Sequence, residues 1–162
     1  MTLKCFSGFA ILMVLAPSLA FSQVYGTAGH IVTVKVQPVT VLQLNAGIVN
    51  MNITGANAVA GQDQMTVTDQ TTSLLWGTNS STKKISVSTS LASPLYTLKV
   101  LAVSPTVGTA APQVTLSTLG ADLLLNIGRS SGSCKLQYTG IALASKGAGS
   151  DSHTITFTVQ TQ

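Results

Sequence analysis

The chain has 162 residues, of which 45% are hydrophobic and only 7% are charged, against about 25% charged residues in an average soluble domain. Its 8 Lys and Arg and 4 Asp give a net charge of +4, the positive charges are scattered, and glutamate is absent. This composition argues against a nucleic-acid-binding surface, which needs clustered cations, and against a hydrolase built on paired carboxylates.

Residues 1–22 have the layout of a secretory signal peptide. Lys4 gives a positive start, residues 9–16 form an unbroken apolar run, and Pro17 precedes two cleavage options, Ser18-x-Ala20 and Ala20-x-Ser22. The apolar run is too short to span a bilayer, and no later segment has spanning length. We therefore expect a secreted protein without a transmembrane segment in its mature chain, located outside the cell, at the cell surface or in the periplasm.

A flexible arm at residues 23–29 leads into a first strand, expected at residues 30–37, with Val32, Val34 and Val36 on one face. Pro38 then interrupts the ladder, because proline has no backbone N–H to donate. A terminal strand of this kind can pair with its own sheet or with the open edge of a neighbouring molecule. The three valines are therefore the candidate assembly residues, and the expected partners are further copies of the chain or other surface proteins.

Alternation of apolar and hydroxyl side chains continues to the end of the chain, which indicates strands with one buried face. Strand-like runs follow at residues 48–54, 65–68, 73–76, 85–88, 95–103, 114–117, 123–127, 134–144 and 153–160. No segment has the pattern of a helix, and the spacing of the runs shows no fixed repeat. About nine or ten strands of this kind predict an all-β fold, a single-domain antiparallel β-sandwich (Ig-like or jelly-roll-like) over residues 30–162.

Two short motifs resemble catalytic signatures. Gly128-x-Ser130-x-Gly132, with Asp151 and His153 downstream, matches the nucleophile elbow of α/β-hydrolases, which needs a turn from a strand into a helix. Ser80-x-x-Lys83 matches the serine–lysine motif of penicillin-recognising enzymes, which needs its serine at a helix start. Strands are expected after both motifs, and Gly and Ser are the residues that β-turns require. We therefore expect turns at both places, no catalytic residues and no enzyme.

The sequence predicts no metal-binding or cofactor-binding residues. His30 and His153 are far apart in the sequence and have no cysteine partner, so they meet only if the first and last strands pair. Asp63, Asp69 and loop carbonyls leave a calcium site open, since oxygen-rich loops are common and unspecific.

Trp76, the only tryptophan, is the candidate ligand contact if the domain binds a carbohydrate. Its apolar neighbours favour the core instead. The threonine rows of the strands fit a solvated face better than an ice-binding one, because their spacing is unequal. Cys134 is alone once Cys5 leaves with the signal peptide, so no intramolecular disulfide is expected. Because Leu136 and Tyr138 continue its alternation, Cys134 is expected on the core side of a strand.

In broad outline the chain resembles subunits of bacterial fimbriae or of another secreted β-sandwich coat, through its signal peptide, alternating N-terminal strand and Thr-rich final strand. It departs from many pilins because it lacks a cysteine pair and ends Thr161-Gln162 without a penultimate tyrosine. We expect a secreted structural or adhesive protein, a bacterial surface, coat or filament subunit that assembles through edge strands. The alternative is a soluble extracellular module that binds a carbohydrate or another small ligand.

Overall fold

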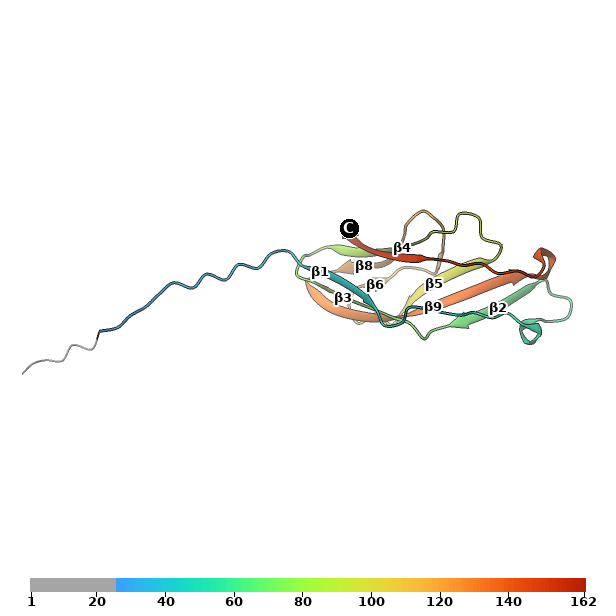
Figure 1. Cartoon of the computed structure of the whole chain (residues 1–162), viewed down its shortest axis with the longest axis horizontal. Helices are drawn as coiled ribbons and strands as arrows, with labels where there is room; N and C mark the ends of the chain where they lie inside the picture. The colour runs from blue at the N-terminus through green and yellow to red at the C-terminus, as the bar shows by residue number, and fades with distance from the viewer. Residues whose placement is uncertain (1–25) are drawn as a thin grey trace, which may run out of the picture. The chain divides into compact units, whose positions relative to one another are not determined.

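The computed structural model describes residues 26–162, so the expected signal peptide at 1–22 and residues 23–25 of the expected arm lie outside the described residues. One unit of the chain ends at Lys35, and Val36–Gln162 form a second, compact unit. Residues 26–35 contain neither helix nor strand, and the second unit contains all the strands of the described part (Figure 1).

Residues 36–162 contain ten strands and two short 3-10 helices, joined by loops. The strands are β1 (Thr40–Leu44), β2 (Gln64–Asp69), β3 (Ser73–Thr78), β4 (Lys83–Thr89), β5 (Thr97–Val103), β6 (Thr109–Ala110), β7 (Val114–Thr115), β8 (Ala121–Ile127), β9 (Ser130–Leu143) and β10 (Ile155–Thr161). The helices are η1 (Gly55–Asn57) and η2 (Ala144–Lys146).

Two antiparallel sheets pack against each other, which confirms the predicted all-β sandwich. One sheet has the order β1-β3-β9-β5-β7, and β2 also pairs with β9; the other sheet has the order β10-β4-β8-β6. All the strand pairs of the described part are antiparallel.

The longest strand, β9 with 14 residues, organises the first sheet. Residues 130–135 of β9 pair with β3 and residues 138–143 pair with β2, so that β2 and β3 lie end to end along one edge. At their junction the Thr72 carbonyl accepts a hydrogen bond from the Leu136 amide at 2.9 Å. Strand β5 covers the opposite edge of β9. One long strand thereby holds three others in the same sheet.

The core lies between the sheets and consists of the apolar side of the alternation. Leu74, Leu123, Leu124 and Leu136 are fully buried within it. Trp76 lies against Gly132 on β9, where a Cβ atom would come within 2.5 Å of the indole ring. Glycine at position 132 therefore allows the ring to lie this close to the neighbouring strand.

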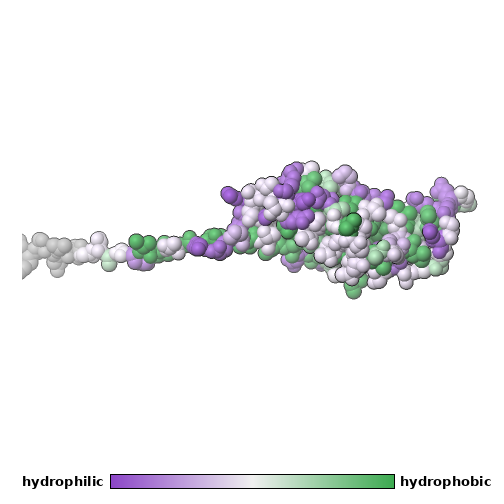
Figure 2. All heavy atoms as spheres, turned by 90° about the horizontal axis from the view of Figure 1, so that it is seen from above, coloured by the Kyte–Doolittle hydropathy of each residue, from purple (hydrophilic) through white to green (hydrophobic). Residues whose placement is uncertain are grey.

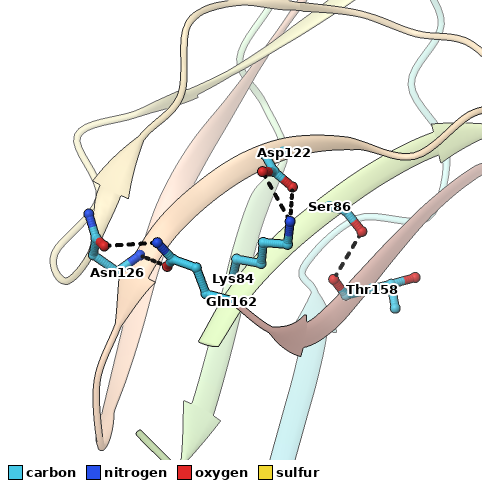
Figure 3. A network of polar contacts seen from close by, with 6 residues as sticks. All are labelled: Lys84, Ser86, Asp122, Asn126, Thr158 and Gln162. Carbon is cyan, nitrogen blue, oxygen red and sulfur yellow. Dashed lines mark hydrogen bonds and ion pairs between the residues drawn. The ribbon is translucent and has the colours of Figure 1, made fainter. Parts of the chain in front are cut away.

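Polar contacts join neighbouring strands of the second sheet, as Figure 3 shows. Lys84 forms an ion pair with Asp122 at 2.9 Å, which joins β4 to β8. The Asn126 backbone amide donates to the Gln162 side-chain oxygen at 2.8 Å, and the Gln162 amide nitrogen donates to Asn126 Oδ1 at 3.1 Å. Asn126 has φ 57°, a conformation that asparagine tolerates better than most residues. The end of the chain is thus fastened to β8.

Two segments that the alternation predicts as strands have no strand partner within the described residues: 30–37 and 48–54. In the second segment Val49 and Met51 nevertheless pack against the core, while Asn50 and Asn52 are exposed. The alternation correctly reports one buried side there, but it does not report backbone pairing. The first strand of the domain therefore begins at Thr40, beyond Pro38, and not at His30.

Candidate assembly surface

The arm, defined here as residues 26–36, exposes the valines that the sequence singles out. Val32, Val34 and Val36 are 71%, 82% and 73% exposed. Residues 26–36 form no strand in the described part of the chain. The space-filling view shows hydrophobic atoms on its surface (Figure 2). The arm has the side-chain pattern of a strand with one apolar face, but it has no sheet of its own.

At one side of the sandwich the two sheets come close together. Their backbones come close where β5 and β7 face β8 and where β5 faces β6. Strands β1 and β10 are the outermost strands at the other side, and no comparable approach joins them in residues 36–162.

Strand β10 carries apolar side chains that are only partly buried. Ile155, Phe157 and Val159 of β10 all pack against the core, and all three keep part of their surface exposed. Leu42 in β1, and Val49 and Met51 in the segment that follows it, are also partly buried and pack against the core. We call the unpaired outer edge of β10, with its row Ile155, Phe157 and Val159, the open edge.

The backbone of β10 is hydrogen-bonded to β4 along one edge, and no strand of the described part pairs with its other edge. Soluble proteins commonly protect such an edge with charged side chains, prolines or bulges. The sequence of β10, Ile-Thr-Phe-Thr-Val-Gln-Thr, contains neither charge nor proline. Its outer edge is therefore able to accept a further strand.

Asn79 binds the root of the arm, defined here as residues 37–39, through both polar atoms of its side-chain amide. The Val39 amide donates to Asn79 Oδ1 at 2.7 Å, and Asn79 Nδ2 donates to the Gln37 carbonyl at 2.8 Å. The Asn79 backbone N–H also donates to the Val39 carbonyl, at 3.2 Å. These bonds continue the pairing of β1 and β3 beyond the last paired residues, Thr40 and Thr78.

The residues of the two catalytic motifs do not form a catalytic group. Ser130 Oγ donates to the Gly128 carbonyl at 3.1 Å within a turn, whereas His153 Nδ1 contacts Thr89 Oγ1 at 3.0 Å. Asp151 accepts from the Tyr96 amide at 2.8 Å. In the other motif, Lys83 Nζ donates to Thr161 Oγ1 at 3.1 Å. Each side chain thus has a different neighbour, and β9 begins at Ser130 where a nucleophile elbow would require a helix.

No group of three or more His, Cys, Asp or Glu residues in the described part of the chain is arranged to hold a metal ion. Asp63 accepts hydrogen bonds from the Ser145 amide and the Ser145 hydroxyl, both at 2.8 Å. These two bonds lower the pKa of the Asp63 carboxyl below its usual value. Asp69 accepts from the Thr71 amide and hydroxyl. Asp69 thus stabilises the turn that follows β2, and Asp63 joins the residues before β2 to η2.

Trp76 and Cys134 both lie in the core. Trp76 is 5% exposed, so its ring presents no face to a ligand in the isolated domain. Its Nε1–H is buried and has no hydrogen-bond partner within the described residues. Cys134 is 4% exposed, which confirms its predicted place on the core side of a strand, and burial raises the pKa of its thiol to about 11.

Comparisons with protein-family models, with curated proteins and with solved structures find no match. Among residues 26–162, no helix has the length and hydrophobicity needed to cross a bilayer. The function is therefore argued from the arm and the open edge.

Sequence reasoning identifies the valines of the arm. It misses two other features, the open edge of β10 and the contacts of Asn79 with the root of the arm. The open edge depends on strand order, which alternation does not encode. The role of Asn79 depends on Gln37, 42 positions away in the sequence. Asn79 follows a predicted strand, so the sequence indicates only an ordinary turn residue.

Proposed function

We propose that the protein is a secreted structural or adhesive subunit of a bacterial surface, coat or filament that assembles by strand addition. In this proposal the arm of one copy pairs with the outer edge of β10 in the next copy. The observation that carries the proposal is an exposed segment with alternating valines, in a chain whose strand β10 has an unpaired edge.

The side-chain spacing of donor and acceptor agrees. Val32, Val34 and Val36 recur every second residue, as do Ile155, Phe157 and Val159 on β10. A strand beside β10 that turns its valines inward places them next to this apolar row, in the geometry of cross-strand pairs. Fully burying a valine contributes about 1.5–3 kcal/mol, and each net backbone hydrogen bond adds about 1 kcal/mol. Ordering the arm opposes these gains.

The low charge of the chain supports the same reading. The arm carries Lys35 as its only permanent charge among residues 26–36, and β10 carries none. Neither strand therefore contains the like-charge pairs that discourage edge-to-edge association.

The test compares the mature chain with full-length variants in which one arm residue is changed. Val34→Asp places a carboxylate on the face that enters the neighbour, whereas Thr33→Asp places the same charge on the opposite face and is the matched control. We expect polymers in electron microscopy, and large masses in light scattering, for the wild type and for Thr33→Asp but not for Val34→Asp.

Equal assembly of the two variants, or a wild type that stays monomeric at every concentration, would contradict the proposal. A monomer that binds sugars on a glycan array, and loses that binding in a folded Trp76→Ala variant, would support the carbohydrate-binding alternative instead.

A further inference from the structure

We infer that Asn79 is a positioning residue: it clamps the arm to its own domain at Gln37 and Val39, so that the segment free to reach a neighbour ends at Val36. The inference rests on the proposed function for its consequence in the polymer. The clamp itself rests on hydrogen bonds that lie entirely within the unit Val36–Gln162.

Pro38 explains why a side chain is needed at this point. Antiparallel pairing of β1 with β3 ends at Thr40 and Thr78, and the next backbone positions are Val39 and Asn79. Proline at 38 has no N–H, so an ordinary ladder cannot continue through it toward the arm. The Asn79 amide bridges the gap, because it offers an acceptor to the Val39 N–H on one side of Pro38 and a donor to the Gln37 carbonyl on the other.

The orientation of the Asn79 amide follows from these partners. Oδ1 meets an N–H group and Nδ2 meets a carbonyl oxygen, so both contacts are favourable. A flipped amide would set donor against donor and acceptor against acceptor. The contact between the Thr40 and Thr78 hydroxyls, at 3.2 Å, lies directly beside the clamp.

The clamp shortens the hinge between the arm and its domain. Without the clamp, the chain N-terminal to residue 39 would be free to rotate. With the clamp, only the chain N-terminal to residue 37 is free. In a polymer built by strand addition, the arm of each subunit is bound in the neighbouring subunit, while residues 37–39 stay fixed to the subunit's own domain. The stiffness of this short hinge then sets how far consecutive subunits can bend relative to each other.

The experiment measures the clamp and its consequence separately in the mature chain. Hydrogen exchange of the Val39 amide, followed by NMR, reports the clamp in any assembly state. Filament bending in electron micrographs, expressed as a persistence length, reports the hinge. Asn79→Ala removes both side-chain bonds, Asn79→Asp keeps only an acceptor for Val39, and Asn52→Ala, which removes an exposed asparagine side chain elsewhere, is the control.

We expect Val39 to exchange at least severalfold faster in Asn79→Ala than in the wild type or in Asn52→Ala. We also expect filaments of both Asn79 variants to bend more, with a melting temperature close to that of the wild type. Unchanged Val39 exchange, or filaments as straight as the control, would overturn the inference.

If Asn79→Ala lowers the melting temperature, Asn79→Asp decides: it keeps the acceptor for Val39, so Val39 exchange should stay near the wild-type rate while the filaments bend more than those of the control. If no filament forms from the wild type, the proposed function fails, and Val39 exchange still decides whether the clamp exists.

Discussion

At the scale of single residues, the contact between Gly132 and Trp76 makes the sharpest demand on the sequence. A Cβ at position 132 would lie 2.5 to 2.9 Å from three atoms of the indole ring, which is too close for either group to keep its place. The crowded ring lies in the core, where strain of this kind costs about 1–3 kcal/mol.

Gly132→Ala is therefore expected to lower the free energy of unfolding by about 1–3 kcal/mol in urea titrations. Gly128→Ala is the control, because a Cβ at position 128 meets no atom within 4 Å. Equal stability of the two variants would show that the ring moves aside without cost.

Cys134 gives a second prediction at this scale. Burial raises the pKa of its thiol to about 11, so that the thiol stays protonated at neutral pH. Since the thiolate is the reactive form, we expect a disulfide reagent at pH 8 to modify Cys134 far more slowly in the folded mature chain than in guanidinium chloride. Ser131→Cys, at an exposed position on the same strand in a Cys134→Ala background, should react at the rate of a free thiol. Fast labelling of native Cys134 would contradict its burial.

The hydrogen bonds between Asp63 and Ser145 make the stability of the protein depend on pH. Its pKa is lowered by hydrogen bonds from the Ser145 backbone and side chain. A carboxyl with a lowered folded pKa stabilises the protein above its unfolded pKa of about 4, and this contribution is lost as pH falls through the folded pKa. We expect melting temperatures below pH 4 to fall less steeply in Asp63→Asn than in the wild type. An Asp63 carboxyl that titrates at its ordinary value by NMR would contradict this.

At the scale of elements, the sequence predicts which face of a strand is buried better than it predicts which strands pair. The alternation places Cys134, Leu136 and Tyr138 on the core side of β9, and all three are buried there. It also predicts the sidedness of residues 48–54, where Val49 and Met51 turn toward the core without strand pairing. Period-2 patterning describes which side is buried, and this signal is the same for a paired strand and for an extended segment lying on a core.

Strand order and end-to-end pairing lie beyond that signal. Nothing in residues 64–78 indicates that β2 and β3 share one edge of β9, because the reason is the length of a partner far along the chain. The open edge at β10 is missed for the same reason. Val32, Val34 and Val36 are recognised because their alternation is local, whereas the clamp at Asn79 is not recognised because both of its partners are distant in sequence.

At the scale of the whole molecule, donor and acceptor are different surfaces of one chain, so the proposed contact is head-to-tail, and it gives open filaments wherever the rotation between copies does not close a ring. This predicts a chain terminator. Val34→Asp keeps β10 and can still receive a wild-type arm, but it cannot donate its own. Small amounts mixed with wild-type monomer should therefore shorten the filaments in proportion to the fraction added, as electron microscopy can measure. Thr33→Asp should leave filament length unchanged, and an equal effect of both variants would argue against directional growth.

The clamp has a consequence for the choice of expression host. Asn79 is exposed and is followed by Ser80 and Ser81, which makes Asn79-Ser80-Ser81 an acceptor for N-linked glycosylation wherever a secretory pathway performs it. The sugar would attach to Nδ2, the same atom that donates to the Gln37 carbonyl. Protein secreted from a glycosylating eukaryotic cell would then carry a bulky group at the contact between Asn79 and Gln37, even though its sequence is unaltered. Material from a bacterial host without that modification would keep the stiff joint.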